Sequence, residues 1–313
     1  MNLLITRRLP PSVITAARAR FDVTYRDEIT ALTPADLRAA LRDYDAILPT
    51  LGDLFRAETF ADVPQPRAKI LANFGVGTNH IDLAAARAAG LHVSNTPGAV
   101  TDATADIALT LILMSARRAS EGERLLRAGN WPGWHPTQLL GSQVTGKTIG
   151  IIGFGRIGQA IARRCHHGFA MPVIFHNRAP IPHDFARQTS LSDTLQADFV
   201  VLAVPATPQT RHLINAATLS QMRPTAHLIN IARGDVVDEP ALIAALHSHQ
   251  IAGAGLDVYE HEPQVPAALI ALDNVTLLPH LGTAALEVRE AMGMMAVANL
   301  IAHLDGLPLP NPV

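Results

Sequence analysis

Short apolar runs alternate with amphipathic segments through the first hundred residues. Three runs have the length of buried strands, at residues 3–5, 46–48 and 70–72. Proline in the first turn or glycine just past the end marks three helices, at about 11–20, 34–41 and 83–89. Because strands that alternate with helices pair in parallel through crossovers, this segment predicts an α/β layer.

A second alternating series begins near Lys147. Its apolar runs predict six strands, at residues 148–152, 173–176, 199–204, 226–231, 252–256 and 275–278. Helical composition separates some of them, at about 157–167, 216–222 and 239–247. We therefore expect a second α/β unit with its own parallel sheet.

Two more helical stretches lie outside these series. One long helix is expected from about 102 to 128, and its apolar first half predicts burial against a neighbouring domain or a second subunit. A loop with Trp131 and Trp134 follows it, and a helix at about 287–304 closes the chain.

Composition limits the classes of partner. Hydrophobic residues make up 48% and charged residues 17%, which is typical of a chain that buries a large core. The formal net charge of −2 leaves no basic excess for nucleic acid. The N-terminus lacks the apolar stretch of a signal peptide, and the longest apolar segment, at 103–116, is too short to span a bilayer. We expect a cytoplasmic protein with neither nucleic-acid nor membrane partners.

Cysteine and histidine spacing predicts no metal site. Cys165 is the single cysteine, so neither an intrachain disulfide nor a CxxC zinc pattern can form. His166 and His167 are adjacent late in a predicted helix and lack metal-ligand spacing.

A glycine motif opens the second series. Gly153, Gly155 and Gly158 form G-x-G-x-x-G between a predicted strand and a predicted helix. Such glycines allow a tight turn, close approach to a pyrophosphate and close packing of helix on strand, and the helix N-terminus offers free N–H groups. The alternative is a glycine-rich turn without a ligand, but the strand–turn–helix context favours a dinucleotide site.

The end of the next strand bears on the choice of cofactor. An acidic residue usually stands there and accepts hydrogen bonds from the adenine ribose, whereas this chain has Asn177 followed by Arg178. Loss of the carboxylate removes repulsion against a 2′-phosphate, and an arginine can bind that phosphate. We predict NADP(H) as the preferred cofactor with NAD(H) possible; the alternative is that Arg178 is a solvated surface residue.

Three segments at predicted strand ends supply a cation, a carboxylate and an imidazole, at residues 230–234, 255–263 and 278–283. Ligands of open α/β sheets bind at the carboxyl ends of strands, so these segments should converge. An arginine can hold the carboxylate of a 2-oxo acid, and a histidine oriented by a carboxylate can protonate its carbonyl oxygen. Two alternatives remain open: Arg233 pairs with Asp235 or Asp238, and Glu260 rather than Glu262 is the carboxylate.

Together these motifs resemble the D-isomer-specific 2-hydroxyacid dehydrogenase family. The matching stretches cover most of the chain, at residues 73–82, 95–97, 101–106, 153–158, 204–210, 230–239, 254–263 and 279–280. Intervals of 29 residues from Arg233 to Glu262 and 18 from Glu262 to His280 also resemble the family. Within it, the chain looks most like the glyoxylate and hydroxypyruvate reductases, which are D-glycerate dehydrogenases.

The resemblance implies a fold and three central roles. It implies two Rossmann-like domains with parallel sheets, in which a cofactor domain at 100–286 is inserted into a discontinuous substrate domain at 1–99 and 287–313. It makes Arg233 the substrate-binding arginine, Glu262 the carboxylate partner and His280 the acid–base.

Further roles follow from the same resemblance. The Val76–Gly77 backbone would bind the substrate carboxylate, and Arg156 and Ile157 would cover the pyrophosphate. The remaining cofactor contacts would come from Thr104, Val204, Pro205, Thr210, Ile231, Ala232, Asp257 and Gly282. Trp134 resembles a tryptophan that enters the substrate site of a partner subunit, which implies a homodimer.

The expected activity is reduction of glyoxylate and hydroxypyruvate to glycolate and D-glycerate with NADPH. The first alternative is another enzyme of the family: a D-lactate-type, phosphite or D-3-phosphoglycerate dehydrogenase. The second is a non-catalytic NAD(P)-sensing protein.

Overall fold

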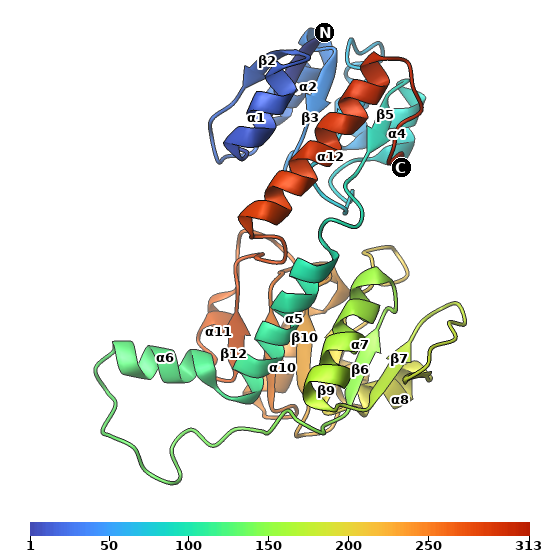
Figure 1. The fold of residues 1–313 in the computed structure, drawn as a ribbon. Helices are drawn as coiled ribbons and strands as arrows, with labels where there is room; N and C mark the ends of the chain where they lie inside the picture. Colours follow the sequence, from blue (N-terminus) through green and yellow to red (C-terminus); the bar gives the residue numbers. More distant parts are fainter. The chain divides into compact units, whose positions relative to one another are not determined.

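The computed structural model describes residues 1–313, which form two compact units (Figure 1). One unit joins Met1–Val100 to Thr283–Val313, and the other is Thr101–Gly282. The first unit is thus built from two separated parts of the chain. No helix in either unit is both long enough and apolar enough to cross a lipid bilayer.

The first unit contains a five-stranded parallel sheet with the order β2-β1-β3-β4-β5. Its strands are β1 (Asn2–Ile5), β2 (Asp22–Tyr25), β3 (Ala46–Leu48), β4 (Ile70–Ala72) and β5 (His92–Ser94). Its helices are α1 (Pro11–Arg18), α2 (Pro34–Asp43), α3 (Ala57–Ala61), α4 (Leu83–Ala88) and α12 (Leu286–Leu304).

The closing helix α12 completes the first unit by packing on α1 and β4. Gly293 allows this close approach, because a Cβ atom there would lie 2.2 Å from the side chain of Val13 in α1. The C-terminal segment is therefore tied to the first residues of the chain rather than to its sequence neighbours.

The second unit contains a seven-stranded parallel sheet with the order β12-β11-β10-β9-β6-β7-β8. Its strands are β6 (Ile149–Ile152), β7 (Val173–His176), β8 (Ala186–Gln188), β9 (Phe199–Leu202), β10 (His227–Asn230), β11 (Gly253–Leu256) and β12 (Val275–Leu277). Strand order reverses between β6 and β9. In open α/β sheets, ligands bind at the carboxyl ends of the strands at such a switch point. The predicted fold class, two α/β units with parallel sheets, is confirmed.

Helices cover both faces of this second sheet. On one face, α5 (Thr101–Ala116) and α7 (Arg156–Phe169) lie side by side (Figure 1). The remaining short elements are α8 (Leu191–Leu195), α9 (Ala216–Leu219), η1 (Gly234–Val236), α10 (Glu239–His247) and α11 (Ala267–Ile270). Each face has its own apolar core: Leu111 and Phe199 belong to one, and Leu228 and Leu242 to the other.

The single long helix expected at 102–128 is wrong: two helices, α5 and α6 (Ala119–Arg127), occupy this stretch. The Ala116 carbonyl accepts the Ser142 N–H at 2.8 Å, and Arg118 is left-handed with φ of 51°, so the helical hydrogen bonds stop there. The buried side of α5 packs on α7, β10 and β11 of its own unit. α6, by contrast, buries none of its residues.

Candidate functional site

Three neighbouring strands bring the predicted cation, carboxylate and imidazole to one edge of the second sheet. β10 leads into the loop with Arg233, β11 into the loop with Glu262, and β12 into the turn with His280. Because the strands are parallel and adjacent, their carboxyl ends lie together. All three side chains belong to the same unit.

His280 and Glu262 form a hydrogen-bonded couple. The Nδ1 atom of His280 lies 2.8 Å from Oε2 of Glu262, and the Tyr259 N–H donates to Oε1 of Glu262 at 3.1 Å. The carboxylate fixes Nδ1 as the protonated nitrogen of the neutral ring, which leaves Nε2 for proton exchange. Both side chains are 30% exposed, so a small molecule can reach the ring.

Electrostatics keep Glu262 charged in this setting. Burial alone would raise the pKa of Glu262, but the hydrogen bond and charge of His280 outweigh it, with help from Arg233, and the pKa of Glu262 is lowered. The structure also excludes Glu260 as the partner of His280, because Glu260 bonds to His212 Nε2 at 2.8 Å instead.

Asp257 holds the turn that carries His280. Its two carboxylate oxygens accept the N–H groups of Leu281 and Gly282 at 2.6 and 2.8 Å, and its carbonyl accepts the His280 N–H at 2.9 Å. The hydroxyl of Thr104 donates to the Gly282 carbonyl at 3.2 Å and closes the turn from α5. Asp257 is 1% exposed, so its carboxylate acts on this backbone.

The Arg233 guanidinium has a donor that no protein group uses. Its NH1 group donates to the Ala232 carbonyl at 2.7 Å, while its Nε is buried without a hydrogen-bond partner. Burial lowers the pKa of Arg233, against the opposing charges of Glu262 and Asp235, but a guanidinium remains charged. Arg233 forms no ion pair with Asp235 or Asp238: Asp238 caps α10 by accepting the Ala241 N–H, and Asp235 acts on Arg233 only through its charge. A half-buried cation with an unused donor suits a substrate carboxylate.

Two residues shape the Arg233 loop. Asn230 holds the loop backbone at two points: its side chain accepts the Ala232 N–H at 3.0 Å and donates to the Arg233 carbonyl at 2.9 Å. Gly234 lets the backbone of Tyr259 pass so close that a Cβ atom would lie 1.8 Å from the Tyr259 carbonyl carbon. The Arg233 and Glu262 loops therefore touch.

The glycine loop joins β6 to α7, beside the switch point of the sheet. Gly153 is left-handed with φ of 96° and faces the Ala203 carbonyl, and a Cβ atom on Gly158 would lie 2.2 Å from the Gly153 carbonyl oxygen. Gly155, in contrast, has nothing within 4 Å of its Cβ position, and no side chain caps the N-terminus of α7. This cradle fits a dinucleotide pyrophosphate, with Arg156 and Ile157 in the first turn.

Asn177 and Arg178 follow β7 at the same edge. The Asn177 amide oxygen accepts the Phe154 N–H at 3.3 Å, and its amide nitrogen donates to the Ala179 carbonyl at 2.9 Å. Asn177 thus links the glycine loop to the segment that carries Arg178. Arg178 is exposed and makes neither an ion pair nor a hydrogen bond, so its charge is free for a ligand.

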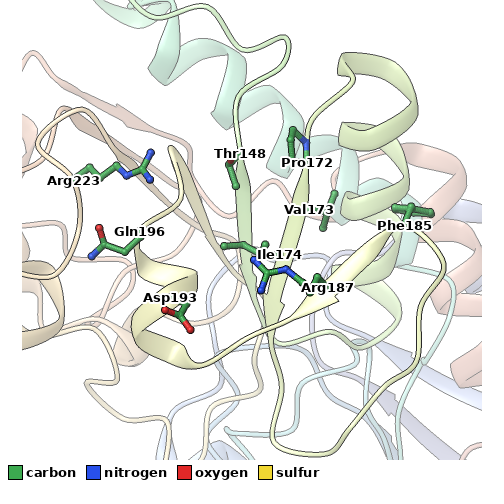
Figure 2. A pocket seen from close by; sticks show the side chains of 9 residues that line it. All are labelled: Thr148, Pro172, Val173, Ile174, Phe185, Arg187, Asp193, Gln196 and Arg223. Atoms are coloured by element: carbon green, nitrogen blue, oxygen red, sulfur yellow. The ribbon is translucent and has the colours of Figure 1, made fainter.

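A separate surface pocket of about 580 Å³ lies around the amino ends of β6 and β7 (Figure 2). Thr148, Pro172 and Arg187 are among its lining residues, and none of the candidate site residues is. Because ligands of open sheets bind at the carboxyl ends, this pocket is distinct from the candidate site.

Comparisons with known proteins agree with this geometry. The family described as "D-isomer specific 2-hydroxyacid dehydrogenase, NAD binding domain" matches residues 109–282. The chain belongs to this family. A glyoxylate reductase of Thermococcus onnurineus is 44% identical over 321 residues, covering 100% of this chain and 95% of the relative. A glycerate dehydrogenase of Hyphomicrobium methylovorum is 38% identical and covers 94% and 93% of the two chains.

A solved structure of a related reductase is also similar to this 2-hydroxyacid dehydrogenase. An NADPH-dependent glyoxylate/hydroxypyruvate reductase from Sinorhizobium meliloti, in complex with NADP and malonate, has a TM-score of 0.89 and 35% identity. The alignment covers 100% of this chain and 96% of that one. The chain is therefore an oxidoreductase of the D-2-hydroxyacid dehydrogenase type.

The other predicted cofactor contacts also lie at strand ends of the dehydrogenase's second unit. Val204 and Pro205 follow β9, Ile231 and Ala232 follow β10, and the Thr210 hydroxyl donates to the Pro205 carbonyl at 2.7 Å. Their contact with a cofactor stays a prediction.

Two predicted substrate contacts lie elsewhere. Val76 and Gly77 belong to the first unit, where the side chains of Asn95 and Asn73 donate to their carbonyls at 2.9 and 3.0 Å. Trp134 is 79% exposed and touches neither Arg233 nor His280 through any hydrogen bond. Both roles remain predictions.

Sequence reasoning missed several residues that hold this site. Asn230 and Gly234 lie in a motif that had been recognised, but only for its arginine. Tyr259 and His212 carried no signal at all, because their partners are distant in sequence: the Tyr259 hydroxyl donates to the Leu278 carbonyl at 2.9 Å. The left-handed φ of 48° at His212 is equally invisible in a sequence.

Proposed function

We propose that this enzyme reduces small 2-oxo acids, glyoxylate and hydroxypyruvate first, to glycolate and D-glycerate with a preference for NADPH. The observation that carries the proposal is the His280–Glu262 couple beside a half-buried Arg233 whose Nε has no hydrogen-bond partner. Relatives named for glyoxylate and glycerate chemistry support the substrate class. We assign the cofactor to the unit Thr101–Gly282 and name the other unit the substrate domain.

Each side chain has one task in this mechanism. Arg233 binds the substrate carboxylate, together with the Val76–Gly77 amides. When bound, the reduced nicotinamide supplies a hydride to the carbonyl carbon. His280 gives its Nε2 proton to the carbonyl oxygen, which becomes the hydroxyl, and Glu262 holds the ring through Nδ1 and stabilises its charged form. Asp257 and Thr104 keep the His280 turn in place.

Substitution of His280 tests the proposal directly. The wild type should oxidise NADPH, followed at 340 nm, when glyoxylate or hydroxypyruvate is added. His280→Ala should lower kcat by about 10²–10⁴-fold, because general acid catalysis contributes that much. His247→Ala is the matched control, since His247 is exposed on α10 and makes no hydrogen bond.

Other outcomes would contradict the proposal. A wild-type rate in His280→Ala would remove His280 from the chemistry. Turnover of D-lactate, phosphite or D-3-phosphoglycerate in place of these substrates would point to another enzyme of the family. Cofactor binding without any turnover would favour an NAD(P)-sensing protein.

The cofactor preference rests on Arg178. Its charge is unpaired at the end of β7, where the acidic residue that would repel a 2′-phosphate is replaced by Asn177. Arg178→Ala should lower the ratio of kcat/KM with NADPH to kcat/KM with NADH by roughly tenfold or more, since a charge-assisted bond contributes about 1.5–3 kcal/mol. Arg187→Ala, in the pocket of Figure 2, should leave the ratio unchanged. A wild type that favours NADH would refute the preference.

A further inference from the structure

A second carboxylate–imidazole pair lies beside the first. Oε1 of Glu260 accepts a hydrogen bond from Nε2 of His212 at 2.8 Å and lies 3.3 Å from the guanidinium of Arg211. The Glu260 side chain is only 8% exposed, so this is not one of the solvated surface pairs that contribute little. Glu260 is two residues before Glu262 on the same loop, and His212 lies in the loop after β9.

The backbone at His212 supports a specific role for this imidazole. Its φ is 48°, in the left-handed region that is uncommon for residues other than glycine. The His212 N–H donates to the Asp235 carbonyl at 2.8 Å, and the Ile214 N–H donates to the Val236 carbonyl at 3.0 Å. The β9 loop is thereby bonded to the segment that follows Arg233.

The Glu260 backbone is also held by a residue of α10. Its N–H donates to Oε1 of Glu239 at 2.8 Å, and Glu239 is a buried residue at the start of α10. Gly234 removes the Cβ atom that would otherwise collide with the Tyr259–Glu260 peptide. Glu260 is therefore the point at which the loops after β9, β10 and β11 meet.

Fixing Glu260 also fixes Glu262. Tyr259, the residue before Glu260, donates its N–H to Oε1 of Glu262, whose Oε2 holds Nδ1 of His280. If the Glu260 carboxylate is removed, the loop at 258–263 loses its side-chain hydrogen bond to His212 in the loop after β9. The carboxylate that orients His280 then loses part of its support, and misplacement of about 1 Å can cost roughly 10²-fold in rate.

We propose that His212 and Glu260 are positioning residues that couple the loop after β9, which carries Val204, Pro205 and Thr210, to the Glu262–His280 couple. The inference rests on the proposed function, because it acts through Glu262 and His280. A purely structural ion pair would change thermal stability alone and leave kcat unaltered.

His212→Gly isolates the imidazole. Glycine adopts the left-handed backbone without strain, so the variant removes the side chain and keeps the fold. We expect kcat for hydroxypyruvate to fall about tenfold, with KM close to that of the control. Tm should fall as well, because Glu260 is largely buried and loses a hydrogen-bond partner. The matched control is His249→Gly, because His249 is also left-handed, with φ of 54°, and is exposed beyond α10.

Substitutions at Glu260 test the pair from the other side. Glu260→Ala should lower kcat as far as His212→Gly, and Glu260→Gln, which retains an acceptor oxygen for His212, should recover most of that loss. The double variant His212→Gly with Glu260→Ala should lose no more than either single variant, because residues that act as one unit are not additive.

Parallel assays of the wild type and His280→Ala separate the possible failures. If His280→Ala loses activity while His212→Gly and Glu260→Ala keep the wild-type kcat, the inference is wrong and the proposed function stands. Additive losses in the double variant, or an equal loss in His249→Gly, also overturn the inference. A wild type that reduces no 2-oxo acid overturns both.

Discussion

The backbone at His280 is left-handed, with φ of 56°, in a region that is uncommon for residues other than glycine. Asp257 accounts for it, because its carbonyl and carboxylate oxygens accept the N–H groups of residues 280, 281 and 282. Such strain persists where surrounding structure over-determines it, and it gathers at functional sites. The position of the imidazole thus depends on a carboxylate 23 residues earlier in the chain.

At the residue scale we predict that Asp257→Asn lowers kcat by about 10- to 100-fold, because an amide group leaves the Leu281 or Gly282 N–H without an acceptor, which costs about 1–3 kcal/mol. The dissociation constant for NADPH, measured by fluorescence titration, should change little, since both carboxylate oxygens serve the backbone. Much weaker NADPH binding with an unchanged kcat would show instead that Asp257 contacts the cofactor.

At the scale of elements, the sequence predicted the buried strands better than the edge strands and the helix boundaries. The runs at 46–48 and 70–72 are strands with the predicted bounds, because continuous apolar runs are buried on both faces of a parallel sheet; the run at 173–176 also has the predicted bounds, although alternate positions of it are only half-buried. β2, β5 and β8 were not predicted: they lie at the sheet edges and keep exposed positions, so they lack such a run. The break between α5 and α6 was missed because its cause, the Ser142 N–H, lies beyond the predicted helix.

The N-terminus of α7 provides a prediction at this scale. Gly155→Ala should leave the fold intact, because φ of −76° suits alanine and nothing lies within 4 Å of the added methyl group. The methyl group should nevertheless obstruct the pyrophosphate and raise the NADPH dissociation constant by roughly 5- to 150-fold, as overpacking costs about 1–3 kcal/mol.

Gly168→Ala, near the other end of α7, is the control. It also has free space, so it should stabilise the helix by about 0.5–1 kcal/mol and leave NADPH binding unchanged. Equal NADPH affinity in Gly155→Ala and the wild type would place the pyrophosphate elsewhere.

At the scale of the whole molecule, α6 and the segment after it stand out because they bury almost nothing. Leu126, Trp131, Trp134 and Leu140 are 60, 50, 79 and 65% exposed. A monomer seldom exposes apolar side chains in such density, so we propose that a second copy of the chain covers them.

Light scattering should therefore give the mass of a dimer, twice 33.4 kDa. Leu126→Glu should shift the protein towards the monomer, whereas Leu307→Glu, at an equally exposed leucine of the first unit, should not. Trp134→Ala should raise KM for hydroxypyruvate while the dimer persists. A wild type that is monomeric at assay concentrations would contradict the dimer and the predicted role of Trp134.

The sequence by itself determined the family, the fold class and the chemical groups of the candidate site. Buried parallel strands and glycine loops need particular residues at short spacing, so Gly153, Arg233 and His280 stand in motifs that a single chain displays. The resemblance made Glu262 the partner of His280, and the structure agrees, but only the tertiary structure decided that Glu260 bonds to His212. Those pairings form between loops from different strands, and their partners are fixed by sheet order and loop geometry, not by neighbours in the sequence.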